Sequence, residues 1–293
     1  MNEKLEEQIA LNCGNEDDYD PYGLSEKFFN NGDIITLSLS VVYFTNGVEN
    51  PIDSNTLVNR ITMANKYFVD AKIDFKIKNV QYVRTKPEQN FNAMKTIQAV
   101  ETISGKHRDD IRNAYYLEHF ELWNSVYGKE NTITMYLYDN VNSSFAGVAG
   151  GIGSTYFAMR VDFLAPNYHT LEHELGHCLG LYHTHEKDVT NGLNNETGDM
   201  VCDTYTSVDT LVYGVNNRCQ YVYDIEIPNE HLAVLINNIM SYTKHECRAS
   251  FTKVQNMRKR KIIESNADLR KAIVGYDTLK TKLWENLQYI TPK

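Results

Sequence analysis

The segment from His173 to His183 reads HELGHCLGLYH. Residues four apart lie on one face of a helix, so His173 and His177 can direct their imidazoles at one zinc ion. Glu174 follows His173 and is placed to take a proton from a zinc-bound water. A catalytic zinc usually has three protein ligands and one open position, so these two histidines predict a third ligand nearby.

Gly180 indicates how the third ligand can reach the same ion. A helix that continued to His183 would carry this side chain about 15 Å along the axis from His173, because each residue advances a helix by about 1.5 Å. Glycine accepts a left-handed backbone, so Gly180 can end the helix and turn the chain back. We therefore expect His183 to complete a three-histidine zinc site.

The whole segment satisfies the pattern HExxHxxGxxH, which is the metzincin signature of zinc peptidases. Metzincins also have a tight turn with a methionine beneath the zinc, and the sequence NIMSY at residues 238–242 fits it. Met240 would then form an apolar floor under the three histidines. Tyr242 could donate a hydrogen bond to the oxyanion of the tetrahedral intermediate.

Three stretches resemble the pappalysin family of metzincins, namely HELGHCLGLYHTH (173–185), GDMVCDT (198–204) and NIMSYTKHECRASFT (238–252). The sequence departs from the family at Tyr205, where proline is usual, and at Ser241, which replaces a common aspartate. The resemblance implies a secreted or periplasmic metalloendopeptidase that hydrolyses protein or peptide substrates.

The resemblance also implies calcium binding and a disulfide. Asp199 and Asp203 match positions near the family's calcium sites, and hard calcium ions prefer carboxylate oxygens. Loop turn chemistry is the alternative explanation for these two aspartates. Cys219 and Cys247 occupy positions that resemble a family disulfide beside the methionine turn.

Two further residues gain roles from the resemblance alone. Cys13, followed by Gly14, is similar to the pro-segment cysteine with which some family zymogens block the catalytic zinc, since a thiolate is a strong zinc ligand. An ordinary thiol in a tail is the alternative. Glu246 matches an acidic position that favours a basic side chain just after the cut bond, although most exposed glutamates are simply solvated.

Apolar periodicity predicts an α/β (α+β) fold. Alternating apolar residues indicate strands, and apolar residues at helical spacing indicate helices. The first of these helices would begin with a cap at Asp53, and others lie toward the end of the chain. The expected strands are 35–44, 73–77, 132–138 and 154–163, and the expected helices follow residue 53 and span 107–127, 251–264 and 266–289. Substrate would lie extended along the strand at 154–163 and add to the sheet edge.

Together with the resemblance, this order predicts a metzincin-like architecture with two subdomains. The upper one, residues 33–183, would hold a mixed twisted sheet, backing helices and the active-site helix. The lower one, residues 184–264, would be irregular and lead into C-terminal helices. Residues 1–32 are interpreted as an N-terminal extension or pro-segment, and residues 265–293 as a C-terminal helical extension.

Composition excludes several other classes of protein. The net charge of −9 argues against nucleic acid as a partner, because phosphates require a basic surface. No apolar run reaches the length of a membrane span, and the acidic start of the sequence has no apolar core of a signal peptide. The basic run 258–261 is interpreted as a solvated helix face. We expect a monomer.

Two other functions fit the same histidines. A gluzincin-like zinc hydrolase would take its third ligand from a downstream glutamate, for which Glu196 is the nearby candidate. A non-catalytic module would use the zinc as a structural pin or as a binding surface. Glu174 argues against the second alternative, because a purely structural zinc site needs no base.

Overall fold

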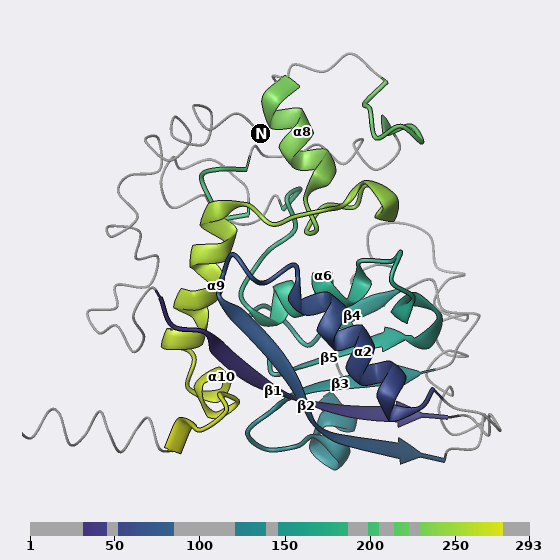
Figure 1. Cartoon of the computed structure of the whole chain (residues 1–293), viewed down its shortest axis with the longest axis vertical. Helices are drawn as coiled ribbons and strands as arrows, with labels where there is room; N and C mark the ends of the chain where they lie inside the picture. The colour runs from purple at the N-terminus through teal and green to yellow at the C-terminus, as the bar shows by residue number, and fades with distance from the viewer. Residues whose placement is uncertain are drawn as a thin grey trace, which may run out of the picture.

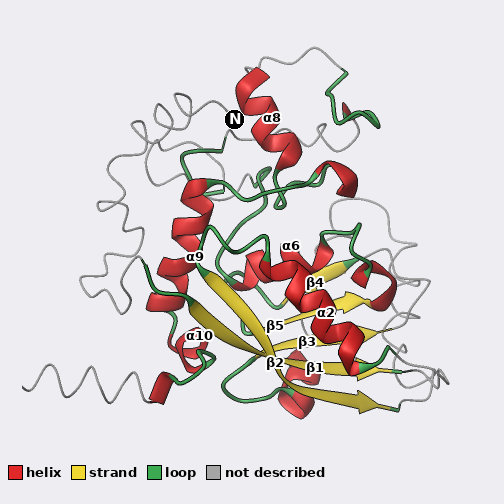
Figure 2. Cartoon of the chain, in the orientation of Figure 1, coloured by secondary structure: helices red, strands yellow, loops and turns green. Residues whose placement is uncertain are grey.

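The computed structural model describes residues 32–45, 52–84, 121–138, 146–186, 199–204, 214–222 and 229–277. Five strands form one sheet in the order β2-β1-β3-β5-β4. Their bounds are β1 Ile35–Phe44, β2 Ile73–Val83, β3 Ile133–Tyr138, β4 Gly147–Ala149 and β5 Tyr156–Arg160. All neighbours are parallel except β4, which runs antiparallel to β5, so the predicted mixed sheet is confirmed (Figures 1 and 2).

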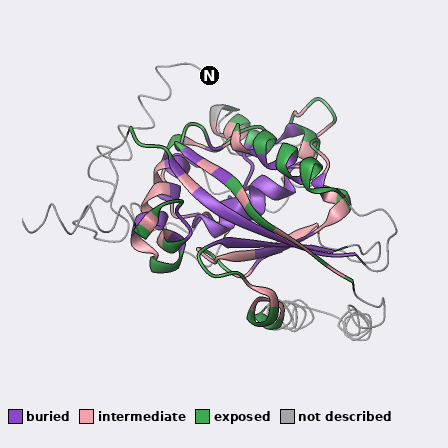
Figure 3. Cartoon of the chain, turned by 60° about the horizontal axis from the view of Figure 1, so that its bottom comes forward, coloured by how far each residue is buried: buried purple, intermediate pink, exposed green. Residues whose placement is uncertain are grey.

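Both faces of the sheet are covered, so β1 and β3 are buried almost throughout (Figure 3). On one face, helices α2 (Ser54–Asn65) and α6 (Thr170–Cys178) pack on the main core. The other face carries a smaller aromatic cluster, in which Trp123 and Tyr127 of the helical segment 121–127 pack on Phe44.

Helix ends follow the caps that the sequence provides. The side chain of Asp53 accepts a hydrogen bond from the backbone of Thr56 and begins α2, as predicted. Thr252 and Gln255 form a capping box at the start of α9 (Lys253–Ser265). The remaining helices are α8 (Asn229–Asn237), α10 (Ala267–Lys271) and two 3-10 turns, η1 (Val161–Leu164) and η2 (His245–Cys247).

Two expectations about surfaces are wrong. The strand predicted at 154–163 ends at Arg160 and pairs with β3 and β4 on its two sides, so β4 is the outer strand there. In the basic run, Arg258 and Lys259 are buried rather than solvated. Arg258 is buried because its guanidinium reaches the chain turn at Gly180, to whose carbonyl its Nε donates over 2.7 Å.

Several predicted segments lie partly or wholly outside the described residues. These are 1–31, most of the helix expected at 107–127 and residues 278–293 of the C-terminal extension. The division into subdomains therefore stays a prediction. Within the described part of the chain, no helix is both long and apolar enough for a membrane span.

Candidate metal centre

Helix α6 places every one of its residues in the interior and ends in a Schellman turn. Gly180 has φ of 86° and donates to the carbonyl of His177, while Leu181 donates to the carbonyl of Gly176. A Cβ at Gly180 would lie 2.2 Å from Cγ1 of Ile262, so a side chain has no room there. The turn directs the following residues back across the end of the helix.

This turn brings three imidazoles together. The Nε2 atoms of His173, His177 and His183 lie 3.0 to 3.2 Å from one another. Nδ1 of His173 lies 2.8 Å from the carbonyl of Ile239, and Nδ1 of His177 lies 2.8 Å from that of Leu181. A carbonyl only accepts, so both Nδ1 atoms carry the proton and both Nε2 atoms present lone pairs.

Converging lone pairs repel one another unless a cation lies between them. A tetrahedral zinc with Zn–N distances of about 2.0–2.1 Å would separate its nitrogens by about 3.3–3.4 Å, close to the spacing found here. Burial lowers the pKa of His177 to about 4 and that of His173 well below its usual value, which keeps the rings neutral. The donor set therefore fits zinc, and it is the one such group of three or more side chains within the described ranges.

Glu174 lies beside the triad with one carboxylate oxygen free. Its side chain is 4% exposed and is hydrogen-bonded by the backbone of Ala149 in β4. Oε2 is buried and has no hydrogen-bond partner in the described structure. Burial raises the pKa of Glu174 to about 8. Gly147 makes this close approach of β4 possible, since a Cβ there would lie 2.7 Å from Oε1 of Glu174.

Met240 lies beneath α6 with no exposed surface. A Cβ on Gly176 would meet its sulfur at 2.5 Å, so the thioether packs directly against the backbone of the zinc-binding helix. The turn around Met240 is held by Asn238, whose Oδ1 accepts from the Met240 amide at 2.8 Å and whose amide bonds Gln255 of α9. The side chain thus packs on the helix that carries His173 and His177, and its role as the floor under the three histidines stays a prediction.

Tyr242 lies at the rim of the triad and is 46% exposed. Its ring centroid lies 4.5 Å from that of His183 and 5.9 Å from that of His173. Partial desolvation of the phenol against the triad, followed by the charge of Glu174, raises its pKa, so the hydroxyl stays a donor at neutral pH. His185 stacks on His183 with centroids 4.9 Å apart and also packs on Tyr242.

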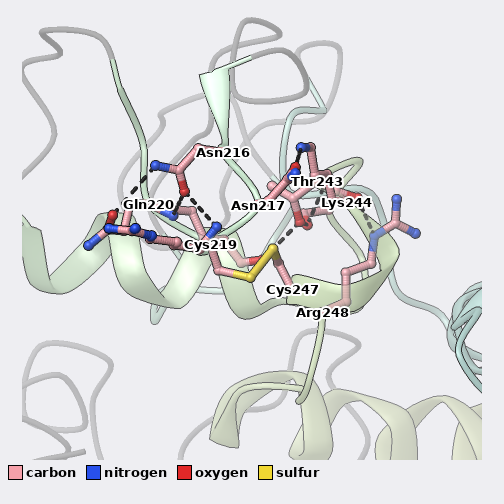
Figure 4. The surroundings of a disulfide bond; sticks show 11 residues. Asn216, Asn217, Cys219, Gln220, Thr243, Lys244, Cys247 and Arg248 are labelled. Carbon is pink, nitrogen blue, oxygen red and sulfur yellow. Dashed lines mark hydrogen bonds between the residues drawn. A yellow bond between two sulfur atoms is a disulfide. The ribbon is translucent and has the colours of Figure 1, made fainter.

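A disulfide joins Cys219 to Cys247, as the resemblance implies (Figure 4). It ties the loop 214–222 to η2, which follows the methionine turn closely in sequence. Cys178 is a buried free thiol, and burial raises its pKa to about 12.

The two aspartates expected near calcium have different surroundings. Both oxygens of Asp203 accept hydrogen bonds at the start of α9, from the hydroxyl of Thr252 at 2.7 Å and the backbone of Val254 at 2.8 Å. Asp199 accepts from Thr204 at 2.6 Å through Oδ1, while its buried Oδ2 has no described partner. Burial raises the pKa of Asp199 to about 7. Calcium binding stays a prediction.

The remaining candidates divide into exposed and undescribed residues. Glu246 is exposed. Cys13 and Glu196 lie outside the described residues. Sequence reasoning missed Arg248, a buried cation near the triad, because a single arginine after a cysteine carries no pattern.

It also missed the anchor of α6. Glu172 is buried and forms a bidentate pair with Arg60 of α2, with distances of 2.7 and 2.8 Å. Arg60 also donates to the carbonyls of Leu164 and Tyr168, which fixes the start of the zinc-binding helix. Their separation of 112 residues leaves no local signal in the sequence.

Comparison with known proteins bears on this arrangement. A model of the Peptidase_M43 family, described as pregnancy-associated plasma protein-A, matches residues 153–264, which include both α6 and the methionine turn. The resemblance to the pappalysin peptidases is confirmed. The pappalysin match, together with the histidine triad, supports a zinc metallopeptidase.

Solved structures show more distant likeness. The crystal structure of metalloproteinase-II from Bacteroides fragilis is 18% identical with a TM-score of 0.31, over 65% of this chain and 54% of that one. A chaperone–substrate complex is 12% identical with a TM-score of 0.33, over 58% of this chain and 32% of that one. The chain thus matches about half and about a third of the length of these two structures. No curated protein matches the sequence.

Proposed function

We propose that this protein is a zinc-dependent endopeptidase that uses Glu174 as its general base. The observation that carries the proposal is the convergence of three imidazole nitrogens within 3.0 to 3.2 Å beside a buried, unpartnered carboxylate oxygen. His173, His177 and His183 would hold the ion. When bound, zinc would act as a Lewis acid that polarises the scissile carbonyl and lowers the pKa of a water molecule.

Glu174 performs the proton transfers in this proposal. Its free Oε2 accepts a proton from the attacking water and then passes it to the leaving amine. Burial supports the holding of this proton, because a carboxyl with a raised pKa can keep a proton near neutral pH between the two transfers. The hydrogen bond from Ala149 fixes the carboxylate, so its free oxygen keeps one direction.

Tyr242 is proposed to stabilise the oxyanion. Its ring packs against His183 at the exposed rim of the site, and its raised pKa keeps the phenol protonated. A phenol in this state can donate a hydrogen bond to the carbonyl oxygen as negative charge develops there.

The outer strand β4 is the proposed position of the substrate backbone. Gly147 and Ala149 of this strand touch Glu174, and β4 pairs with β5 on one side only in the described sheet. An extended peptide could add to the free side by backbone hydrogen bonds. Binding of this kind needs no chain terminus, which supports an endopeptidase. The disulfide fits a secreted or periplasmic protein.

The test is the variant Glu174→Gln, which keeps the size of the side chain and removes the base. We expect zinc content to stay at one ion per chain by atomic absorption, while kcat for casein-derived peptides falls about 10²–10⁴-fold. The control Glu130→Gln changes an exposed glutamate before β3 and should keep full activity. Equal activity of Glu174→Gln and wild type would exclude the proposal, as would cleavage that survives removal of zinc.

A further inference from the structure

Arg248 is a buried cation whose guanidinium makes one hydrogen bond to the described residues. It follows the disulfide-bonded Cys247, is 9% exposed, and donates from Nε to the carbonyl of Thr243 over 2.8 Å. Its two terminal nitrogens have no hydrogen bond or ion pair within the described residues. Figure 4 shows the guanidinium directed away from the disulfide. The single hydrogen bond from Nε therefore orients the guanidinium and leaves its two terminal nitrogens available to donate to a ligand.

The guanidinium lies close to the histidine triad. Thr243, which holds it, follows Tyr242, whose ring packs 4.5 Å from that of His183. Burial is the main cause that raises the pKa of Glu174 and lowers that of His173, and the nearby positive charge of Arg248 acts on both groups as a smaller effect. Burial lowers the pKa of Arg248 to about 10, which leaves the side chain charged at neutral pH.

No carboxylate of the described chain neutralises this charge by direct contact. Glu246 is the nearest acidic residue along the sequence, but its side chain is exposed and no ion pair joins it to Arg248. A buried charge without a partner is costly, so an anion that reached the fork would be bound favourably. A guanidinium fork matches the two oxygens of a carboxylate, and a carboxylate is an anion that peptides carry.

We propose that Arg248 binds a substrate carboxylate beside the scissile bond and so makes the enzyme selective for acidic peptides. This inference rests on the proposed peptidase function and deepens it. The carboxylate can belong to an aspartate or glutamate that flanks the cut bond, or to the C-terminus of a short substrate. The selectivity is the reverse of the basic preference that Glu246 would give.

The test maps cleavage by the zinc-loaded full chain in peptide libraries randomised on both sides of the bond. We expect aspartate and glutamate to be enriched about tenfold or more over glutamine and asparagine at one flanking position. Arg248→Gln should abolish the enrichment by raising KM for acidic peptides, and Arg248→Lys should retain part of it. Arg218→Gln, which removes an exposed arginine of the disulfide-bonded loop, is the matched control and should change nothing.

A second pair of substrates separates the two sources of the carboxylate. Peptides with an internal glutamate and an amidated C-terminus report on side-chain recognition. Peptides with leucine at the same position and a free carboxylate next to it report on terminal recognition. Arg248→Gln should weaken whichever arm the wild type favours and leave the other arm within about twofold.

Three results would overturn the assignment. They are the absence of both an acidic enrichment and a preference for a free C-terminal carboxylate, a basic enrichment that Glu246→Gln removes, or an equal loss for every peptide in Arg248→Gln. If the wild type shows no zinc-dependent cleavage at all, the proposed function fails instead. In that case, binding of peptides to the zinc-loaded Glu174→Gln variant still tests the role of Arg248. Equal dissociation constants for glutamate- and glutamine-containing peptides would refute that role.

Discussion

Helix α6 and the segment from Asn238 to Arg248 enclose the triad from two sides, and they are held by different means. In α6 the positions of the imidazoles follow from helical spacing and the turn at Gly180. The other segment has only a short 3-10 turn and is fixed by side chains, with Asn238 bonded to Gln255 and Ser241 to Thr243. The disulfide adds a covalent tie to this second region.

Because the two regions are held differently, one can carry the metal ligands while the other determines substrate selectivity. A regular helix places its metal ligands through a fixed spacing of four residues. A shift of one residue would turn an imidazole away from the metal, so the sequence must keep this spacing. A segment held by side-chain bonds and a disulfide can change single residues, such as Glu246 or Arg248, without moving the triad. We therefore expect changes in α6 to affect metal binding, and changes in the second segment to affect stability and selectivity.

The largest effect is expected for the pair His183→Ala and His185→Ala. Removing the third ligand should lower zinc affinity at least about a hundredfold, whereas removing the stacked neighbour should change it less than about tenfold. Competition with a chromophoric chelator measures both affinities. Near-normal affinity in His183→Ala would mean that another residue supplies the third ligand, as in a gluzincin.

Removal of the disulfide tests the other side of the comparison. The double variant Cys219→Ser/Cys247→Ser opens a link across 28 residues, which should lower the free energy of unfolding by about 3 kcal/mol. Urea unfolding of the variant and of the oxidised wild type measures the loss. Zinc affinity should change less than about tenfold. A collapse of metal binding would show that the two regions are not separable.

Gly180→Ala should destabilise the protein through both backbone and packing. Alanine at φ of 86° is strained, and its Cβ would lie 2.2 Å from Ile262, so we expect a loss of about 3 kcal/mol. Gly275 is the matched control, because it has φ of 79° and open space around a Cβ. Gly275→Ala should therefore cost only about 1 kcal/mol in thermal or urea unfolding.

A double-variant cycle isolates the packing part of the Gly180 effect. Ile262→Ala removes the Cγ1 atom that the new methyl group would meet. The combined variant should be more stable than the sum of the two single losses predicts, since the clash disappears. Strict additivity would place the whole cost of Gly180→Ala in the backbone.

The sequence predicts the parts of this molecule that follow a local repeat. The bounds of β1, the cap at Asp53 and the end of the histidine helix agree with their patterns, because two-residue alternation, helix caps and a glycine turn are local properties. The Cys219–Cys247 pairing came from the family resemblance, since cysteine positions alone allow several pairings.

Properties that depend on distant partners could not be predicted. Arg258 appeared in the sequence as part of a charged run, yet its Nε reaches the carbonyl of Gly180 across 78 residues and is buried. The identity of the outer strand required the position of β4, whose three residues are too short for a clear alternation. The burial of Arg248 could not be predicted, because it depends on the path of the chain through the methionine turn and the Cys219–Cys247 disulfide.

The smallest predicted effect concerns Lys259 of α9, whose ammonium lies over the rings of Phe68 and Phe251. Its Nζ lies 3.5 Å from the ring centroid of Phe251, and Phe251 in turn approaches Gly176 of α6. Nζ is buried without a hydrogen bond to the described residues, and burial lowers the pKa of Lys259 well below its usual value. The unfolded chain then binds a proton that the folded chain lacks, so stability should rise with pH from the folded pKa up to about 10.5.

Lys259→Met keeps the length of the side chain and removes the titrating group. We expect the free energy of unfolding at neutral pH to increase by about 1 kcal/mol, and its rise toward alkaline pH to disappear. Urea unfolding at a series of pH values measures both changes. A loss of stability in Lys259→Met would instead mean that the ammonium is charged in the fold and that its contacts with Phe68 and Phe251 stabilise the protein.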